Sequence, residues 1–243
     1  MTGFDAFGEI ARYYDKIMDY VNYDRWFDVT TALAELLPDN FTHVDAACGT
    51  GTLLGKLRRA NWHSFGTDLS VGMLRTGNTS QALATMWGRF AAADLRAMPF
   101  RGSIDYVTSL FDSVNFLLTY DDMQRAFREV SMALKPTGLF YFDVVTERMV
   151  TEHFEGQEWT EYNGSFTTTW RSSYSHQTSV TETHVRVGSG TDGVFRERIY
   201  SLDDIRQALT DAGFTVLAML DARGWKTPGK KTVRVDVIAS RDD

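Results

Sequence analysis

Residues that suit one buried helix face recur every three or four positions at the start of the chain. In a first segment they are Phe7, Ile10, Ala11, Tyr14, Ile17, Met18 and Val21; in a second they are Tyr23, Trp26, Phe27, Thr30, Leu33, Ala34 and Leu37. This spacing places them on one side of an α-helix. We therefore predict two amphipathic helices, of which the second ends at Pro38.

Between residues 41 and 145, short apolar runs alternate with helical patterns. Strands are predicted at residues 41–46, 62–67, 86–92, 104–110 and 138–145, and helices at residues 52–60, 71–76 and 121–134. A regular alternation of strand and helix is typical of a parallel sheet that carries helices on both faces. The pattern therefore predicts an α/β fold with a Rossmann-like, doubly wound sheet.

The pattern changes between residues 159 and 200, which are rich in Thr, Ser, Tyr, Trp and Val and contain no proline. Residues 180–187 alternate with a period of two, which is typical of a strand with one buried face. Glycines at 164 and between 188 and 193 indicate turns. We predict an antiparallel sheet of three or four strands, inserted into the α/β domain.

The chain returns to the first pattern after this insertion. Ser201 and Asp204 have the spacing of a helix capping box, and the helix that they begin ends near Gly213. Strands at residues 214–220 and 232–240 then form a predicted antiparallel hairpin. Accordingly, we assign residues 1–150 and 201–243 to one Rossmann-like domain, and residues 151–200 to an inserted antiparallel β lid.

Composition narrows the classes of partner. The 243 residues suffice for one well-buried domain, and the net charge of −7 disfavours nucleic acid. A single cysteine, Cys48, excludes an intrachain disulfide, and no cluster indicates a metal site. The early acids Asp5 and Glu9 argue against a signal peptide, and no apolar run is long enough for a membrane span. We expect a cytoplasmic protein with no membrane partner.

The most informative segment is Asp45-Ala-Ala-Cys-Gly-Thr-Gly51, between a predicted strand and a predicted helix. A strand, a glycine turn and a helix N-terminus form the usual geometry for a nucleotide-like ligand. A Walker A loop is excluded because Thr50 and Leu57 stand where a glycine and a Ser or Thr are needed around Gly55-Lys56. A dinucleotide site of the G-x-G-x-x-G type lacks its third glycine, which is Leu54 here.

Three acids follow predicted strands and indicate a different ligand. Asp45, Asp68 and Asp94 each stand at a carboxyl end, where ligands bind in open α/β sheets. S-adenosylmethionine (SAM) has an ammonium group, two ribose hydroxyls and an adenine amino group but no phosphate. Asp45 is placed to attract the ammonium or order its loop, Asp68 to accept the hydroxyls, and Asp94 to accept the amino group. Taken singly, each aspartate is equally explained as a helix cap.

Together these motifs resemble class I SAM-dependent methyltransferases over about residues 8–240. The segments that match are residues 45–51, 68–70, 94–95, 109–116 and 134–140, with Ala47 and Thr137 in place of glycines. The resemblance implies a seven-stranded sheet with an antiparallel last strand, SAM as the cofactor and S-adenosylhomocysteine as its product. The residues implied to bind the cofactor are Tyr14, Trp26, Asp45, Ala47, Cys48, Gly49, Gly51, Asp68, Leu69, Met73, Asp94, Leu95, Leu110 and Asp112.

The N-terminal segments, with Arg12-Tyr-Tyr-Asp15 and Tyr23-Asp-Arg-Trp26, add detail to this resemblance. They are similar to small-molecule methyltransferases whose N-terminal helices cover the cofactor, such as sugar N,N-dimethyltransferases and glycine/sarcosine N-methyltransferases. That similarity implies that Tyr14 and Trp26 line the pocket around the methionine end of SAM. On spacing alone, both residues are also explained as helix core, and Asp112 is also explained as a cap.

The acceptor is less defined, and we expect the inserted β lid at residues 151–200 to be the region that binds it. The segment after the fourth predicted strand, residues 110–113, lacks the Asn/Asp-Pro-Pro-aromatic loop of enzymes that methylate bases. We therefore expect N- or O-methylation of a small molecule by in-line transfer. Tyr14, Glu182 and His184 are candidates for a general base, although the last two also fit a solvated sheet face. A non-enzymatic SAM-binding regulator and an NAD(P)-dependent oxidoreductase remain alternatives, and both a monomer and a homodimer remain open.

The basic residues Lys226, Lys230, Lys231 and Arg234 form the one notable positive cluster near the C-terminus. We expect them to lie on a solvated hairpin.

Overall fold

The computed structural model describes residues 5–79 and 89–243. The α-helices are α1 (Ala6–Ile17), α2 (Tyr23–Leu33), α3 (Thr52–Arg59), α4 (Val71–Thr79), α5 (Tyr120–Ala133), α6 (Glu147–His153) and α7 (Leu202–Asp211), and short 3₁₀ helices cover η1 (Ala34–Leu36) and η3 (Ser113–Phe116). The strands are β1 (His43–Ala46), β2 (Ser64–Asp68), β3 (Phe90–Ala92), β4 (Ile104–Ser109), β5 (Leu134–Val145), β6 (Glu158–Tyr162), β7 (Thr167–Ser175), β8 (Val180–Val187), β9 (Thr191–Arg198), β10 (Phe214–Asp221) and β11 (Arg234–Arg241).

Seven strands form one sheet in the order β10-β11-β5-β4-β1-β2-β3. Strands β1 to β5 are parallel to one another, whereas β11 runs antiparallel to both β5 and β10. The predicted Rossmann-like sheet with an antiparallel last strand is therefore confirmed. Because the order reverses direction at β1 and β4, the carboxyl ends of these two central strands border a crevice that can accept a ligand.

Helices cover both faces of this sheet, as the alternating pattern requires. On one face, the apolar residues of α5 and α7 pack on Val44, Phe140 and Phe142. On the other face, α2 and α3 pack on Tyr106 and Tyr141. The strands are buried along nearly their whole length, which explains why they read as apolar runs without alternation.

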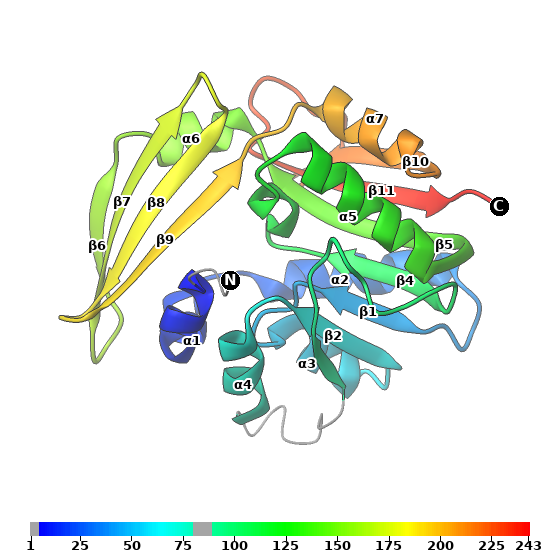
Figure 1. Cartoon of the computed structure of the whole chain (residues 1–243), viewed down its shortest axis with the longest axis horizontal. Helices are drawn as coiled ribbons and strands as arrows, with labels where there is room; N and C mark the ends of the chain where they lie inside the picture. Colours follow the sequence, from blue (N-terminus) through cyan, green and yellow to red (C-terminus); the bar gives the residue numbers. More distant parts are fainter. Residues whose placement is uncertain (1–4, 80–88) are drawn as a thin grey trace.

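The inserted segment forms a second sheet of four antiparallel strands in the order β6-β7-β8-β9. It lies between β5 and α7 in the chain, and it stands beside the main sheet in Figure 1. The capping box predicted at the start of α7 is present, because the Ser201 hydroxyl accepts the Asp204 N–H at 3.0 Å and donates to its carboxylate. The predicted insertion of three or four strands is confirmed with four.

Several predicted boundaries shift. Strand β3 begins at Phe90, and residues 86–88 of the strand predicted at 86–92 lie outside the described part of the chain. Strand β5 begins at Leu134, four residues before the predicted start at Gly138. None of the helices formed by residues 5–79 and 89–243 is long and apolar enough to cross a lipid bilayer.

Helix α1 lies between the α/β domain and the inserted sheet, because it contacts α4 of the former and β9 of the latter (Figure 1). Its cap residue Asp5 accepts the Gly8 N–H and the Ser70 hydroxyl, each at 2.8 Å, and Asp15 accepts the Thr50 hydroxyl. The backbones of α1 and α4 approach closely, since a Cβ added at Gly72 would lie 2.6 Å from the Cα of Gly8. This close packing holds α1 over the carboxyl ends of the strands.

The variant Gly72→Ala tests the packing of α1 on α4. Alanine favours a helix by about 1 kcal/mol over glycine, but here its methyl group would collide with the backbone of Gly8. We expect a loss of about 1–3 kcal/mol in the free energy of unfolding, as for other overpacked sites, and faster amide hydrogen exchange in α1. The matched control is Gly190→Ala, where an added Cβ meets nothing within 4 Å. Equal free energies of unfolding for the two variants would contradict the close packing of α1 on α4.

Candidate functional site

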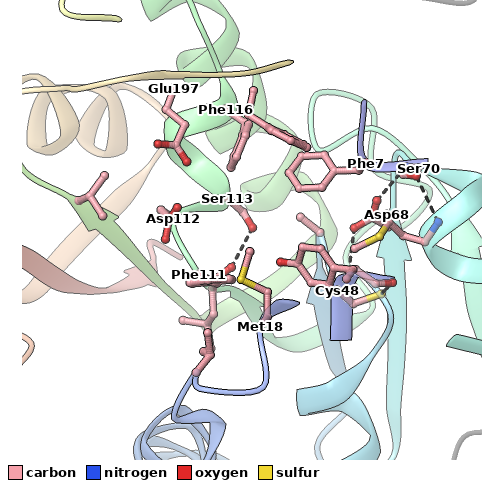
Figure 2. Close-up of a pocket in the computed structure, with 18 of the residues that line it drawn as sticks. Phe7, Met18, Cys48, Asp68, Ser70, Phe111, Asp112, Ser113, Phe116 and Glu197 are labelled. Atoms are coloured by element: carbon pink, nitrogen blue, oxygen red, sulfur yellow. Dashed lines mark hydrogen bonds between the residues drawn. The ribbon is translucent and has the colours of Figure 1, made fainter. Parts of the chain in front are cut away.

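A cavity of about 830 Å³ lies between the carboxyl edge of the main sheet, α1 and the inner face of the inserted sheet. Residues from the ends of β1, β2, β3 and β4 line one side, and residues of β6 to β9 line the other. Figure 2 shows the rings of Phe7 and Phe116 between Asp68 on one side and Asp112 on the other. This cavity contains most of the residues that the sequence indicated.

The glycine loop after β1 turns sharply through left-handed backbone conformations. Gly49 and Gly51 have φ values of 59° and 84°, which glycine adopts without strain. Ala47 has a φ of 59°, which is costly for a residue with a Cβ and explains why a glycine suits this position better. The N–H of Cys48 donates to the carbonyl of Thr67 at 2.9 Å, and this bond holds the loop against β2.

Asp68 fixes the same loop from the end of β2. One carboxylate oxygen accepts the N–H of Gly49 and the other accepts the N–H of Ser70, both at 2.8 Å. Burial raises the pKa of Asp68, while these two hydrogen bonds oppose that rise. A carboxylate accepts about four hydrogen bonds, so Asp68 retains lone pairs for hydroxyl donors in the cavity.

Asp45 lies deeper, at the end of the central strand β1. Its carboxyl oxygen accepts the hydroxyl of Thr108 at 2.8 Å. Since that hydroxyl donates its proton to Asp45, it must accept from the Nε2–H of His43, which lies 3.0 Å away. His43 is then left with Nδ1 as the acceptor for Ser64 at 3.1 Å. Burial lowers the pKa of His43 to about 3, so its imidazole ring is uncharged and places no positive charge near Asp45.

The Asp45 carboxyl group is nearly unexposed, and burial raises its pKa to about 7. Within residues 5–79 and 89–243, no lysine or arginine forms an ion pair with it. A buried carboxylate is stable only when a positive charge or several donors compensate it. Asp45 therefore faces the cavity as a negative group suited to a cationic ligand.

Asp94 differs from the other two acids because it already has a cationic partner. The guanidinium of Arg96 contacts both of its oxygens, the shortest bond being 2.7 Å, and also reaches Asp122 at 2.7 Å. These bonds to Arg96 lower the pKa of Asp94. Asp94 and the adjacent Leu95 line the cavity, so an amino group of a ligand would meet a carboxylate that is firmly oriented.

The structure brings together thirteen of the residues implied to bind the cofactor. They are Tyr14, Trp26, Asp45, Ala47, Cys48, Gly49, Asp68, Leu69, Met73, Asp94, Leu95, Leu110 and Asp112, all of which line the cavity. Gly51 does not line it and instead caps α3. Burial raises the pKa of the Cys48 thiol and of the Tyr14 hydroxyl well above their usual values. The role of Tyr14 as a general base stays a prediction.

The other two candidates for a base, Glu182 and His184, lie outside the cavity. Strand β8 alternates, so that Thr181 and Thr183 line the cavity whereas Glu182 and His184 point to the outer face. There Glu182 accepts from His184 at 2.8 Å and from Arg196 at 2.6 Å. The structure therefore places both side chains outside the cavity, on the solvated sheet face that was the alternative interpretation.

The structure shows a charged group at the end of β4, of which the sequence had indicated only Asp112 as a site residue. Phe111 and Asp112 have φ values of 61° and 52°, both left-handed, and the fully buried Asp143 accepts the N–H of Phe111 at 2.6 Å. Arg234 forms ion pairs with Asp143 and, at 2.7 Å, with Asp112. Its side chain is 17% exposed, so the expectation that Arg234 lies on a solvated hairpin was wrong.

Glu197 completes this group from the inserted sheet. It lines the cavity, and Figure 2 shows its carboxyl group pointing toward Asp112. Burial and the adjacent Asp112 raise the pKa of Glu197 well above its usual value. The sequence carried one signal for this group, since Asp143 is a single acid within the apolar run of β5, and such an acid needs a buried partner.

Comparisons with known proteins agree with this geometry. Residues 44–138 match the family model described as a methyltransferase domain. A putative methyltransferase of Geobacillus sp. (strain WCH70) is 28% identical, with 97% of this chain and 100% of the relative covered. A SAM-dependent methyltransferase from Clostridium acetobutylicum ATCC 824 superimposes with a TM-score of 0.82 at 23% identity, with 98% of this chain and 100% of that chain covered.

A third likeness concerns an enzyme with a defined acceptor. The amino pentose methyltransferase CalS10 from Micromonospora echinaspora, solved with SAM bound, superimposes with a TM-score of 0.69 at 24% identity. The match covers 90% of this chain and 91% of that chain. The chain therefore has the fold of SAM-dependent methyltransferases. The match of residues 44–138 to a methyltransferase domain agrees with that fold.

Replacing Asp68 tests the cofactor end of the cavity. Asp68→Ala removes the acceptor of two loop N–H groups and the expected acceptor of the ribose hydroxyls. We expect affinity for S-adenosylhomocysteine to fall by about 1.5–3 kcal/mol, measured by calorimetry. Asp39→Ala, at an exposed position, is the control and should bind as the unmodified chain does. Unchanged affinity in Asp68→Ala would remove this residue from the site.

Proposed function

We propose that this protein transfers the methyl group of SAM to a nitrogen or oxygen atom of a small-molecule acceptor. The observation that carries the proposal is the buried Asp45 carboxyl group, which lies at the cavity with no cationic partner among the described residues. The ammonium group of SAM supplies the missing charge. A dinucleotide would instead place its pyrophosphate beside Asp45 and Asp68, where like charges repel.

Bound SAM supplies an activated methyl group on a sulfonium, whose leaving group is a neutral thioether. No acid is required at the leaving group, so the residues of the chain act mainly by alignment and by excluding water. Asp45, Asp68 and Asp94 fix three separate parts of the cofactor. Helix α1 closes the cavity with Phe7 and Tyr14, and its contacts with β9 and α4 keep this cover in place.

The acceptor region lies on the side of the inserted sheet, where Thr181, Thr183 and Glu197 line the cavity. Hydroxyl and carboxyl groups on an otherwise aromatic surface suit a polar organic molecule. The likeness to an amino pentose methyltransferase supports a small acceptor of this kind. The acids that line the cavity and the net charge of −7 also disfavour a nucleic acid as the acceptor.

The proposal predicts binding of S-adenosylhomocysteine in the micromolar range, measured by calorimetry. It also predicts release of this product when SAM is incubated with a mixed panel of small amines and alcohols. NADP⁺ serves as the control ligand and should not raise the thermal midpoint. Stabilisation by NADP⁺ without stabilisation by S-adenosylhomocysteine would favour an oxidoreductase, whereas tight binding without turnover of any acceptor would favour a regulatory role.

Cofactor binding should also depend on pH through Asp45. With a folded pKa of about 7, its carboxyl group is mostly protonated at pH 6 and mostly ionised at pH 8. Because the ammonium group needs the ionised form, affinity for S-adenosylhomocysteine should rise about tenfold between these values. Burial raises the pKa of Asp68 as well, which acts in the same direction.

The variant Asp45→Asn isolates this contribution. It should bind more weakly at pH 8 and show a shallower pH dependence, since the titrating group nearest the end of β1 is absent. A slope equal to that of the unmodified chain would assign the pH dependence to another residue.

A further inference from the structure

The inserted sheet contributes a group to the cavity that none of the cofactor motifs uses. Trp159 and Trp170 are paired across β6 and β7, and their rings are stacked with centroids 5.6 Å apart and an interplanar angle of 5°. Glu161 lies on the same face of β6 as Trp159. All three side chains line the cavity. We call them the tryptophan–glutamate group.

The carboxylate of this group is oriented by both indoles. One oxygen of Glu161 accepts the Nε1–H of Trp159 at 3.2 Å, and the other accepts the Nε1–H of Trp170 at 3.3 Å. An indole N–H only donates, so both oxygens of the Glu161 carboxyl group act as acceptors here and its orientation is fixed. Two of about four acceptor positions are used, which leaves lone pairs for a ligand.

The two tryptophans are held in turn by their neighbours. Phe154 packs on Trp159 with ring centroids 5.9 Å apart, and Trp170 packs against a hydrophobic cluster that includes residues of α1 and β8. Each tryptophan is partly buried, so little side-chain conformational entropy remains to be lost when a ligand binds. The group is therefore preorganised, with an anion beside two aromatic surfaces.

The balance of charge in the cavity indicates the sign of its ligand. Two arginines line it, and both are engaged: Arg96 with Asp94 and Asp122, and Arg234 with Asp112 and Asp143. Among the described residues, Glu161 forms no ion pair with a lysine or arginine, since its partners are the two indoles. An anionic ligand would find no unengaged cation on this part of the wall, whereas a cation would find both a carboxylate and aromatic rings.

We infer that the tryptophan–glutamate group binds the ammonium group of the acceptor, and that the acceptor is an organic amine. This inference rests on the proposed function and specifies its acceptor. An ammonium beside Glu161 gains an ion pair with a partly desolvated carboxylate, and the faces of Trp159 and Trp170 attract the same charge. A neutral alcohol gains only ordinary hydrogen bonds, and a carboxylate is repelled by Glu161.

The test uses three probes that share a ring and differ in one group: cyclohexylamine, cyclohexanol and cyclohexanecarboxylate. Each is titrated at neutral pH into the protein saturated with S-adenosylhomocysteine, and binding is followed by ligand-observed NMR. We expect the amine to bind at least about tenfold more tightly than the alcohol, and the carboxylate more weakly than both. Equal affinities for the amine and the alcohol would overturn the inference.

Glu161→Gln keeps the size of the side chain and removes its charge. It should lower the affinity for cyclohexylamine about tenfold and change the affinity for cyclohexanol by less than about twofold. The matched control is Glu158→Gln on the same strand, where the glutamate is exposed and paired with Arg171 at 2.9 Å. If both variants bind the amine as the unmodified chain does, Glu161 is not its partner.

The double variant Trp159→Phe, Trp170→Phe separates the indole donors from the aromatic surface. It retains two rings but leaves Glu161 without its two N–H partners, so the preference for the amine over the alcohol should shrink. Binding of S-adenosylhomocysteine should be unchanged in every variant, because Asp45, Asp68 and Asp94 are intact. The same measurement shows that each variant is folded.

The two proposals fail in different ways. Failure of the unmodified chain to bind S-adenosylhomocysteine would refute the proposed function and this inference with it. Normal binding of S-adenosylhomocysteine, together with no preference for the amine or with a preference that Glu161→Gln leaves intact, would refute this inference alone.

Discussion

A carboxyl group buried at the end of the central strand is the constraint on which the site depends. Removing Asp45 from water without a cationic partner is unfavourable, and the structure offsets this cost only in part, through one hydroxyl and the neutral His43 behind it. A positively charged ligand in the cavity would offset the remaining cost. In the proposed function, the same group would therefore destabilise the empty protein and favour binding, as is common at functional sites.

Much of the fold could be predicted because its signals are local. The alternation of apolar runs and helical patterns indicated a doubly wound sheet, and the cap at Ser201 and the turn at Gly49 to Gly51 depend on adjacent residues. The strand ends that carry Asp45, Asp68 and Asp94 also follow from this pattern. Parallel strands bring their carboxyl ends together, so acids distant in the chain converge without any further information.

The parts that could not be predicted depend on contacts between distant segments. Arg234 appeared to belong to a basic hairpin, and only the antiparallel pairing of β11 with β5 places it beside Asp143. The left-handed turn at Phe111 and Asp112 includes a phenylalanine, which rarely adopts this conformation, so its identity carries no signal for the turn. For Glu182 and His184 the period of two was visible, but the face of β8 that meets the cavity was not.

Helix α1 has a consequence for the order of events in the proposed reaction. It packs on α4, which follows Asp68 and Ser70 in the chain, and on β9, which carries Glu197. Its displacement would uncover both sides of the cavity together, and its return would close both. In the proposed reaction, exchange of the spent cofactor and release of the product would therefore be coupled mechanically through this one helix.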